Sequence, residues 1–178
     1  MKEINKPSVD QLIELFNQLF LPDYNTVLVR GDDEPIYLPE DDQNPHNRVV
    51  FAHGFYASAL HEIAHWCVAG SERRKLVDFG YWYKPDGRTA QEQAEFEKVE
   101  IKPQAYEWIM SVASGHKFHF SADNLSSDLG ASDQFKGNVY ATVQKLLEKG
   151  MPDRLSQLVK VLLHASGKEK LSAGDFTL

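Results

Sequence analysis

The sequence predicts an α+β fold in which a small mixed sheet packs with about five helices. Three runs with the composition of β-strands lie in the first half of the chain, at residues 26–29, 48–52 and 76–83. Segments with apolar residues at helical spacing precede, separate and follow these runs. No repeat, low-complexity tract or linker divides the 178 residues, so we expect one domain covering 1–178.

The N-terminal elements are bounded by ordinary start and stop signals. Ser8 is a suitable N-cap for a first helix, and Pro22 is expected to close that helix. After the first strand, a polar loop at 31–47 contains the short apolar run 36–38, which predicts an extended edge. Gly54 then turns the chain from the second strand into the next helix.

The C-terminal elements are mostly helical. The third strand is expected to end at a turn at residues 85–87, before Thr89 opens a long helix that reaches about Ala113. Pro103 predicts a kink or a restart within this helix. Two further amphipathic helices follow and are expected to end at Gly150 and Gly167.

Composition places the chain among ordinary water-soluble globular proteins. Hydrophobic residues make up 42% and charged residues 25%, and no apolar run approaches the length of a membrane span. Cys67 is the one cysteine, which excludes an intrachain disulfide, fits the reducing cytoplasm and predicts a buried, inert thiol. The net charge of −7 argues against direct nucleic-acid binding as the main role and favours a cationic partner.

The motif with the most chemical content is His61-Glu62-Ile63-Ala64-His65. On a helix, residues four apart lie on the same face about 6 Å apart along the axis, so His61 and His65 can bind one metal ion. Glu62 points about 100° away around the helix and can reach a metal-bound water without being a ligand. The spacing predicts a metalloenzyme with Glu62 as the catalytic residue, and it leaves the metal unnamed.

The H-E-x-x-H motif has only three fixed positions, so the same letters also occur by chance on exposed helix surfaces. The context favours a metal site, because apolar residues surround the two histidines. Ser58 is a possible N-cap for this helix, and Gly70 lies just past its end. The basic run at 73–75 follows, where positive charge suits the helix dipole.

Glu100 is the best candidate for a third metal ligand. Val99 and Ile101 flank it, whereas the nearby Glu92, Glu95 and Glu97 lie among polar residues. A carboxylate on a partly buried helix face needs a compensating positive charge, which a metal ion supplies. The alternative is an ion pair between Glu100 and a neighbouring lysine or an arginine.

Several segments together resemble a known family. These segments are spread over residues 31–105, a span of nearly half the chain, and none of them lies in the C-terminal third. They are GDDEPIYLP at 31–39, RVVFAHGFYASALHEIAHW at 48–66, VDFGYWY at 77–83, PDGR at 85–88 and VEIKPQA at 99–105. In this order they resemble the bacterial elongation factor P hydroxylase family.

The resemblance implies hydroxylation of the lysine side chain of translation elongation factor P that carries a β-lysyl group, with molecular oxygen as co-reactant. It also implies a zincin-like fold and a 2-His-1-carboxylate site at His61, His65 and Glu100. Three ligands on one side of iron(II) leave positions open for oxygen and substrate. Fe(II) is therefore the expected cofactor, although zinc or another divalent metal can occupy such a site in crystals. The order His, His, then a distant Glu differs from the usual oxygenase triad and is typical of zinc hydrolases, so no 2-oxoglutarate cosubstrate is inferred.

Residues outside the triad are candidates for substrate binding. Asp32, Asp33 and Glu34 belong to a loop with further carboxylates at 40–42, which suits a lysyl-lysine side chain with its ammonium groups or is simply a solvated surface. Three more candidates are Tyr37, His53 and Tyr56. The tyrosines build a pocket for an alkyl chain and its cation or belong to the core, and the histidine lines the site or satisfies a backbone group.

Two other classes of function compete with the hydroxylase. In a zinc-dependent peptidase or nuclease, Glu62 would act as the general base that deprotonates a metal-bound water. A non-catalytic binder of a translation factor would hold a structural metal, which needs four protein ligands. Only three plausible ligands are present in the sequence, which disfavours the second class.

Overall fold

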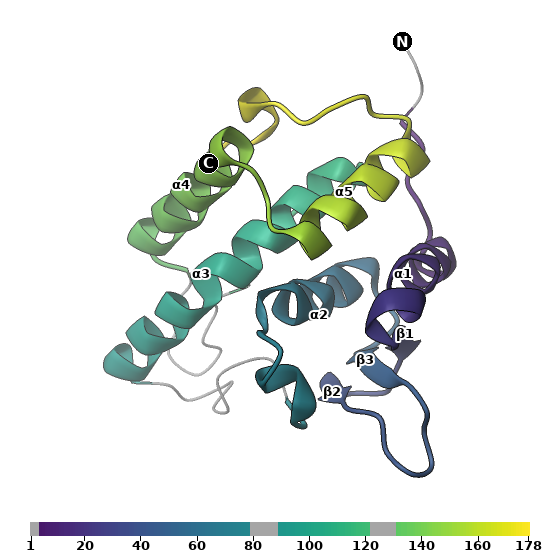
Figure 1. Ribbon diagram of the computed structural model, residues 1–178. Coiled ribbons are helices and arrows are strands. Elements are labelled where there is room, and N and C mark those ends of the chain that lie inside the picture. Colours follow the sequence, from purple (N-terminus) through teal and green to yellow (C-terminus); the bar gives the residue numbers. More distant parts are fainter. Residues whose placement is uncertain (1–3, 79–88, 122–130) are drawn as a thin grey trace.

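The structure is a computed structural model that describes residues 4–78, 89–121 and 131–178. Within these ranges it has five α-helices and three strands, which confirms the α+β prediction (Figure 1). In chain order the elements are α1 Val9–Tyr24, β1 Thr26–Arg30, β2 Ile36–Leu38, β3 Asn47–Phe51, α2 Tyr56–Val68, η1 Arg73–Lys75, α3 Ala90–Ala113, α4 Asp133–Lys149, α5 Asp153–Ser166 and η2 Ala173–Asp175. None of the described helices is long and apolar enough to cross a membrane. The zincin-like arrangement implied by the family resemblance stays a prediction.

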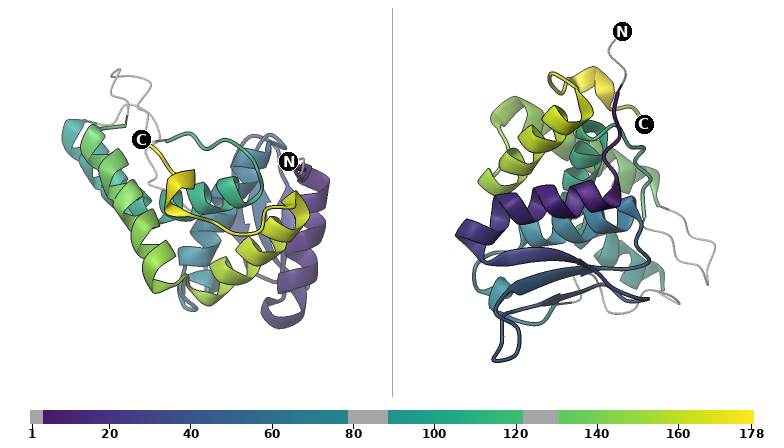
Figure 2. Two further views of the ribbon diagram at one scale, coloured as in Figure 1. Left: turned by 90° about the horizontal axis from the view of Figure 1, so that it is seen from above. Right: turned by 90° about the vertical axis from the view of Figure 1, so that its right-hand side faces the viewer.

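The sheet is mixed, with β3 between a parallel β1 and an antiparallel β2. The helices α1 and α2 pack over one face of this sheet (Figure 2). Val49 and Phe51 of β3 lie on the same face of the sheet, because side chains alternate along a strand. Both are buried beneath these helices. The predicted third strand is represented by a single bridge between Asp78 and Tyr37. Leu76 and Val77 are not in a strand, and residues 79–83 and the predicted turn at 85–87 lie outside the described residues.

Most helix boundaries follow from local chemistry. Ser8 and Thr89 each cap a helix through a complete capping box, as their positions predicted. Gly150 and Gly167 stand at the C-caps of α4 and α5, also as expected. The helices α1 and α3 therefore begin where the sequence predicted, directly after Ser8 and Thr89.

One expectation about proline was wrong, and one half of a second was wrong. Pro22 lies inside α1, which continues to Tyr24 and ends at Asn25 with φ 48°. A proline in the last turn costs one helical hydrogen bond, and the left-handed cap at Asn25 gives a better end point. Pro103 lies inside α3, which does not restart there because buried side chains on both sides hold the helix against α2 and α4. The kink at Pro103 stays a prediction.

Ser58 is not the N-cap of α2, which is a further correction. The N-cap is Phe55, whose side chain makes no capping hydrogen bond. His53 and Gly54 have φ angles of 59° and 67°, and these two left-handed residues reverse the chain directly after β3. The reversal starts the helix at Tyr56 and so places Ser58 within the first turn.

The hydrophobic core is a continuous cluster to which all five helices contribute. On the sheet side, Phe16 and Phe20 of α1 pack edge-on against Trp66 of α2. On the other side, α3 lies between α2 and the pair α4 and α5 (Figure 1). The two helices α2 and α3 therefore meet in the interior of the protein, and the predicted metal ligands lie where they meet.

Candidate metal centre

The three predicted metal ligands lie together. His61 and His65 project from α2 toward Glu100 on α3, and their ligand atoms all lie within 4.8 Å of one another. The Nε2 atoms of the histidines are 3.2 Å apart. Glu100 Oε1 lies 3.0 Å from Nε2 of His65, and Oε2 lies 3.8 Å from Nε2 of His61. Among the described residues this is the group of three that fits a metal ion.

Two of these separations, 3.0 and 3.2 Å, match those between ligands of one transition-metal ion, and the third is 3.8 Å. Nitrogen and oxygen atoms held about 2.1 Å from an ion at adjacent positions are about 3.0–3.4 Å from each other. Glu100 is completely buried, and its Oε1 atom makes no hydrogen bond of acceptable geometry. Lone pairs brought this close together repel unless a proton or a cation lies between them. The donor set therefore suits a bound metal.

The charge state of Glu100 agrees with this assignment. Burial by itself would raise the pKa of Glu100, but the adjacent imidazoles of His65 and His61 lower it on balance. The side-chain amide of Gln104 supports the carboxylate with a hydrogen bond of 3.4 Å to Oε2. Gln104 is itself held by Ser121, whose hydroxyl accepts at 2.8 Å and whose backbone N–H donates at 3.1 Å. Glu100 is thus ionised and fixed in position.

Glu107 is a site residue that the sequence reasoning missed. Its Oε2 atom accepts a hydrogen bond from Nδ1 of His61 at 2.8 Å, and the residue is 5% exposed. This bond leaves Nε2 of His61 facing Glu100, which is how a second carboxylate orients a metal-binding imidazole. Burial would lower the pKa of His61, but the charge and hydrogen bond of Glu107 outweigh it and raise that pKa to about 10. The signal in the sequence was the spacing, because Glu107 lies two helical turns after Glu100 on the same face.

Glu62 is buried beside the candidate ligands and does not belong to the group that could hold a metal ion. Burial raises its pKa to about 7, against the opposing effect of His61. It lines a pocket of about 20 Å³ together with His65, Tyr37 and Asp78, which is room for about one water molecule. A carboxyl group with this pKa can both accept and give up a proton near neutral pH.

Two arginines hold the C-terminal end of α2. Arg154 of α5 donates to the carbonyls of Trp66, Cys67 and Ala69 at 2.6–3.2 Å, and its guanidinium lies 4.6 Å from the Trp66 ring. Arg74 donates to the same Ala69 carbonyl at 2.7 Å. Positive charge at this end satisfies the last carbonyls of the helix and opposes its dipole. The C-terminal third therefore supports the helix that carries both histidines, a role without a motif of its own.

The predicted acidic residues lie in an exposed turn at the opposite end of α2. The backbone N–H of His53 donates to the carbonyl of Asp32 at 2.9 Å, which ties this turn to the start of the helix. Asp33 lies 3.8 Å from the half-exposed ring of His53. The exposed Asp32, Asp33 and Glu34 carry the charge of this turn. His61 lies about 8 Å further along the helix axis than Tyr56, at 1.5 Å per residue.

The remaining predicted residues have different surroundings. The Asp41 carboxylate accepts hydrogen bonds from backbone N–H groups of its own turn and forms an ion pair with Arg48. The Glu40 carboxylate accepts a hydrogen bond from the side chain of Asn25. These carboxylates therefore stabilise the loop locally. Tyr37 is half-buried, lines the small pocket beside Glu62 and donates to the Arg74 carbonyl at 2.7 Å. Tyr56 is buried and stacks on the ring of His116 at 3.7 Å.

Comparison with known proteins gives the same family as the sequence motifs. The family model described as Elongation factor P hydroxylase matches residues 15–176, which is most of the chain. A curated protein of Haemophilus influenzae, named Elongation factor P lysine hydroxylase, is 56% identical over 155 residues. That match covers 87% of this chain and 87% of the relative. The family match also covers the C-terminal helices, which contain none of the motifs. We conclude that the chain belongs to the elongation factor P hydroxylase family.

Proposed function

We propose that this protein hydroxylates the lysine side chain of elongation factor P after a β-lysyl group has been attached to it. The observation that carries the proposal is the convergence of His61, His65 and Glu100 in a chain of this family. The relative of known name acts on a lysine of elongation factor P, which supports the substrate. The additional β-lysyl group is taken from the family resemblance, and the acidic turn beside the start of α2 supports it.

The three side chains would hold iron(II) by two imidazole nitrogens and one carboxylate. When bound, iron(II) would supply the activation of molecular oxygen that insertion into a C–H bond requires. One oxygen atom enters the C–H bond, and the other leaves as water with two electrons and two protons from a reductant. Glu107 keeps His61 oriented, and Gln104 keeps Glu100 in place.

Glu62 is the residue that we assign to proton transfer. Its carboxyl group is buried, has a pKa near 7 and lies with His65 beside a water-sized pocket. It would pass protons to the oxygen atom that leaves as water. The same properties suit the general base of a zinc hydrolase, so Glu62 does not distinguish the two functions. Identification of the reaction product distinguishes them.

Isotopic labelling tests the proposed reaction directly. The protein is loaded with iron(II), supplied with a chemical reductant and incubated with β-lysylated elongation factor P under ¹⁸O₂. Mass spectrometry should detect one ¹⁸O atom on the modified lysine, and a parallel reaction in H₂¹⁸O under ¹⁶O₂ should give no label. Cleavage of the factor or of its β-lysyl group without oxygen incorporation would establish a hydrolase instead.

A second prediction concerns recognition of the substrate by the acidic turn. The β-lysyl group adds positive charge and reach, so Asp32, Asp33 and Glu34 would favour the modified factor over the unmodified one. The triple reversal D32K/D33K/E34K should weaken binding of the modified factor about tenfold and reduce its dependence on salt. The matched control is reversal of the exposed Glu14, Asp23 and Glu169 to lysine, which makes the same change in net charge away from the acidic loop. Unchanged binding in D32K/D33K/E34K would show that the turn is only a solvated surface.

A further inference from the structure

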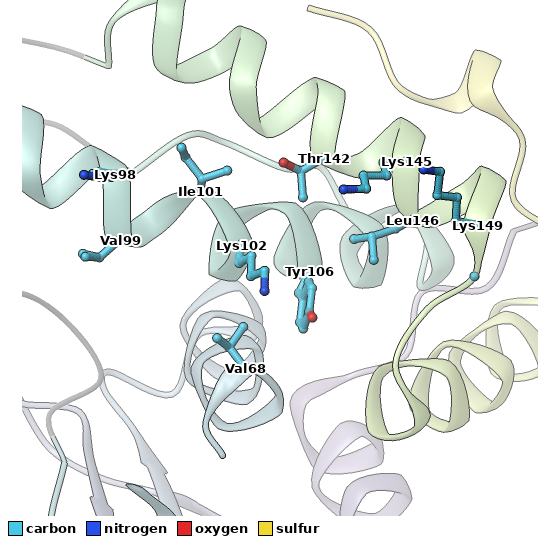
Figure 3. Close-up of a pocket in the computed structure, with 11 residues that line it drawn as sticks. Val68, Lys98, Val99, Ile101, Lys102, Tyr106, Thr142, Lys145, Leu146 and Lys149 are labelled. Carbon is cyan, nitrogen blue, oxygen red and sulfur yellow. The ribbon is translucent and has the colours of Figure 1, made fainter.

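A groove with four lysines lies on the outer side of α3. It has a volume of about 490 Å³ and runs between α3, α4 and the end of α2 (Figure 3). Its floor includes Val68, Ile101 and Leu146, one from each of these helices. The lysines are Lys98, Lys102, Lys145 and Lys149, all exposed. We call this feature the lysine groove.

The charge of the lysine groove is opposite to that of the chain. Its lining contains four lysines and no aspartate or glutamate, although the chain carries a net charge of −7. Elsewhere, Lys75 and Lys168 pair with carboxylates at 2.7 and 2.9 Å. Within the described parts of the chain, none of the four lysines of the groove has a carboxylate within 4.0 Å. Four like charges that lack counter-charges repel each other, so a bound anion would be favourable.

The apolar floor narrows the choice of ligand. A free phosphate or a nucleic-acid backbone needs charge but makes little use of an aliphatic surface. Here Val99 is 52% exposed at the edge of the groove, beside the aliphatic part of the lining. A peptide segment that carries both carboxylates and apolar side chains would satisfy both properties.

The groove is also close to the candidate metal centre. Lys98, Val99, Ile101 and Lys102 occupy the same two turns of α3 as Glu100. Glu100 faces inward and is completely buried, whereas these neighbours face the groove. An α-helix with its side chains is about 10–12 Å across, so a protein bound at the metal centre can also contact the groove.

We propose that the lysine groove binds an acidic segment of the protein substrate, at a distance from the lysine that is modified. This assignment rests on the proposed function, since it takes elongation factor P as that substrate. The positive groove would bind the acidic segment of the substrate, while its cationic side chain is inserted near the metal beside the acidic turn. The substrate would then contact two patches of opposite charge. Two such contacts fix the orientation of the substrate, which a single contact does not.

Charge reversal on α4 tests the groove without touching the turns that carry Glu100. The variant is K145E/K149E, and the matched control is K117E/K160E, which reverses two exposed lysines outside the groove. For intact modified factor, K145E/K149E should raise KM and Kd about tenfold with kcat within about twofold of the unaltered protein. The control should change neither value, and metal content and circular dichroism should be the same in both. K145Q/K149Q should give a smaller effect in the same direction.

A short peptide substrate separates groove binding from the chemistry. A peptide with only the modified lysine and its nearest neighbours cannot reach the groove, so K145E/K149E should not affect its turnover. Carbodiimide cross-linking joins lysine amines to carboxylates in contact, and it should link Lys145 or Lys149 to an aspartate or glutamate of the factor. Equal loss in the control, or cross-links only at lysines outside the groove, would overturn the proposal.

Two further measurements separate the other possible occupants. Binding of single-stranded RNA that is lost in K145E/K149E while factor binding is unchanged would assign the groove to nucleic acid and overturn the proposal. Self-association lost in the same variant, with factor binding unchanged, would assign the groove to a second copy of this chain and also overturn it. If the factor binds through the groove but gains no oxygen, the groove proposal stands and the proposed function fails. If the factor gains oxygen equally well with K145E/K149E, the function stands and the groove proposal fails.

Discussion

Alanine at His61, His65 or Glu100 will abolish metal retention and turnover while leaving the fold intact. Each replacement removes one of three ligand atoms that lie within 4.8 Å of one another. The loss should exceed the roughly 10–100-fold that follows removal of a residue that only supports a ligand. Metal retention is measured by elemental mass spectrometry after dialysis. Turnover is measured as oxygen incorporation into the factor. Circular dichroism reports the fold.

A graded comparison makes this prediction sharper. Glu107→Gln keeps the size of a residue that touches His61 but not the metal, so it should lower metal affinity about 10–100-fold without abolishing binding. Glu100→Gln keeps the volume of the fully buried Glu100 and distinguishes loss of the ligand from loss of packing. Full metal content and turnover in Glu100→Ala would remove Glu100 from the ligand set.

Zinc is expected to occupy the same site without supporting turnover. Zinc binds nitrogen and oxygen ligands more tightly than iron(II), but it has no redox chemistry. Protein reconstituted with iron(II) should hydroxylate the factor in air, and protein loaded with zinc should give no oxygen incorporation under the same conditions. Exchange of zinc for iron(II) under anaerobic conditions should restore activity, which shows that the zinc-loaded protein is folded.

The contrary outcome of this experiment has a clear meaning. Activity of zinc-loaded, iron-free protein under nitrogen would exclude the hydroxylase and support the hydrolase in which Glu62 is the general base. Glu62→Gln then serves as the matched variant, because it keeps the volume of the buried side chain but cannot transfer the proton. It should retain metal under either function, since Glu62 does not belong to the ligand group.

Several features of the site were not predictable from the sequence. Glu107 has the same two-turn spacing from Glu100 that many unrelated glutamates have, and only the contact with His61 makes it a site residue. Arg154 is 87 residues from Cys67, whose carbonyl it caps, and no local pattern announces such a contact. The lysine groove combines residues from α3 and α4 that have ordinary surface spacing on each helix. In all of these, the partner comes from a distant part of the chain.

Local errors have a different cause. Ser58 and Pro22 were assigned from the chemistry of single residues, which is a weak preference that surrounding structure can override. The left-handed pair His53 and Gly54 set the start of α2 instead, and the left-handed Asn25 set the end of α1. By contrast Ser8 and Thr89 were predicted correctly, because a capping box is a complete set of hydrogen bonds within four consecutive residues.

The sequence by itself determined the α+β class, the pairing of His61 with His65 and the choice of Glu100 as the third candidate. The helical period alone places two residues four positions apart on one face, whatever the rest of the chain does. Tertiary structure decided how α3 crosses α2, and thereby which carboxylate meets which imidazole. The crossing depends on side-chain packing between helices that are distant in the chain. Spacing along one helix therefore predicted the histidine pair, while contacts between helices were decided by packing.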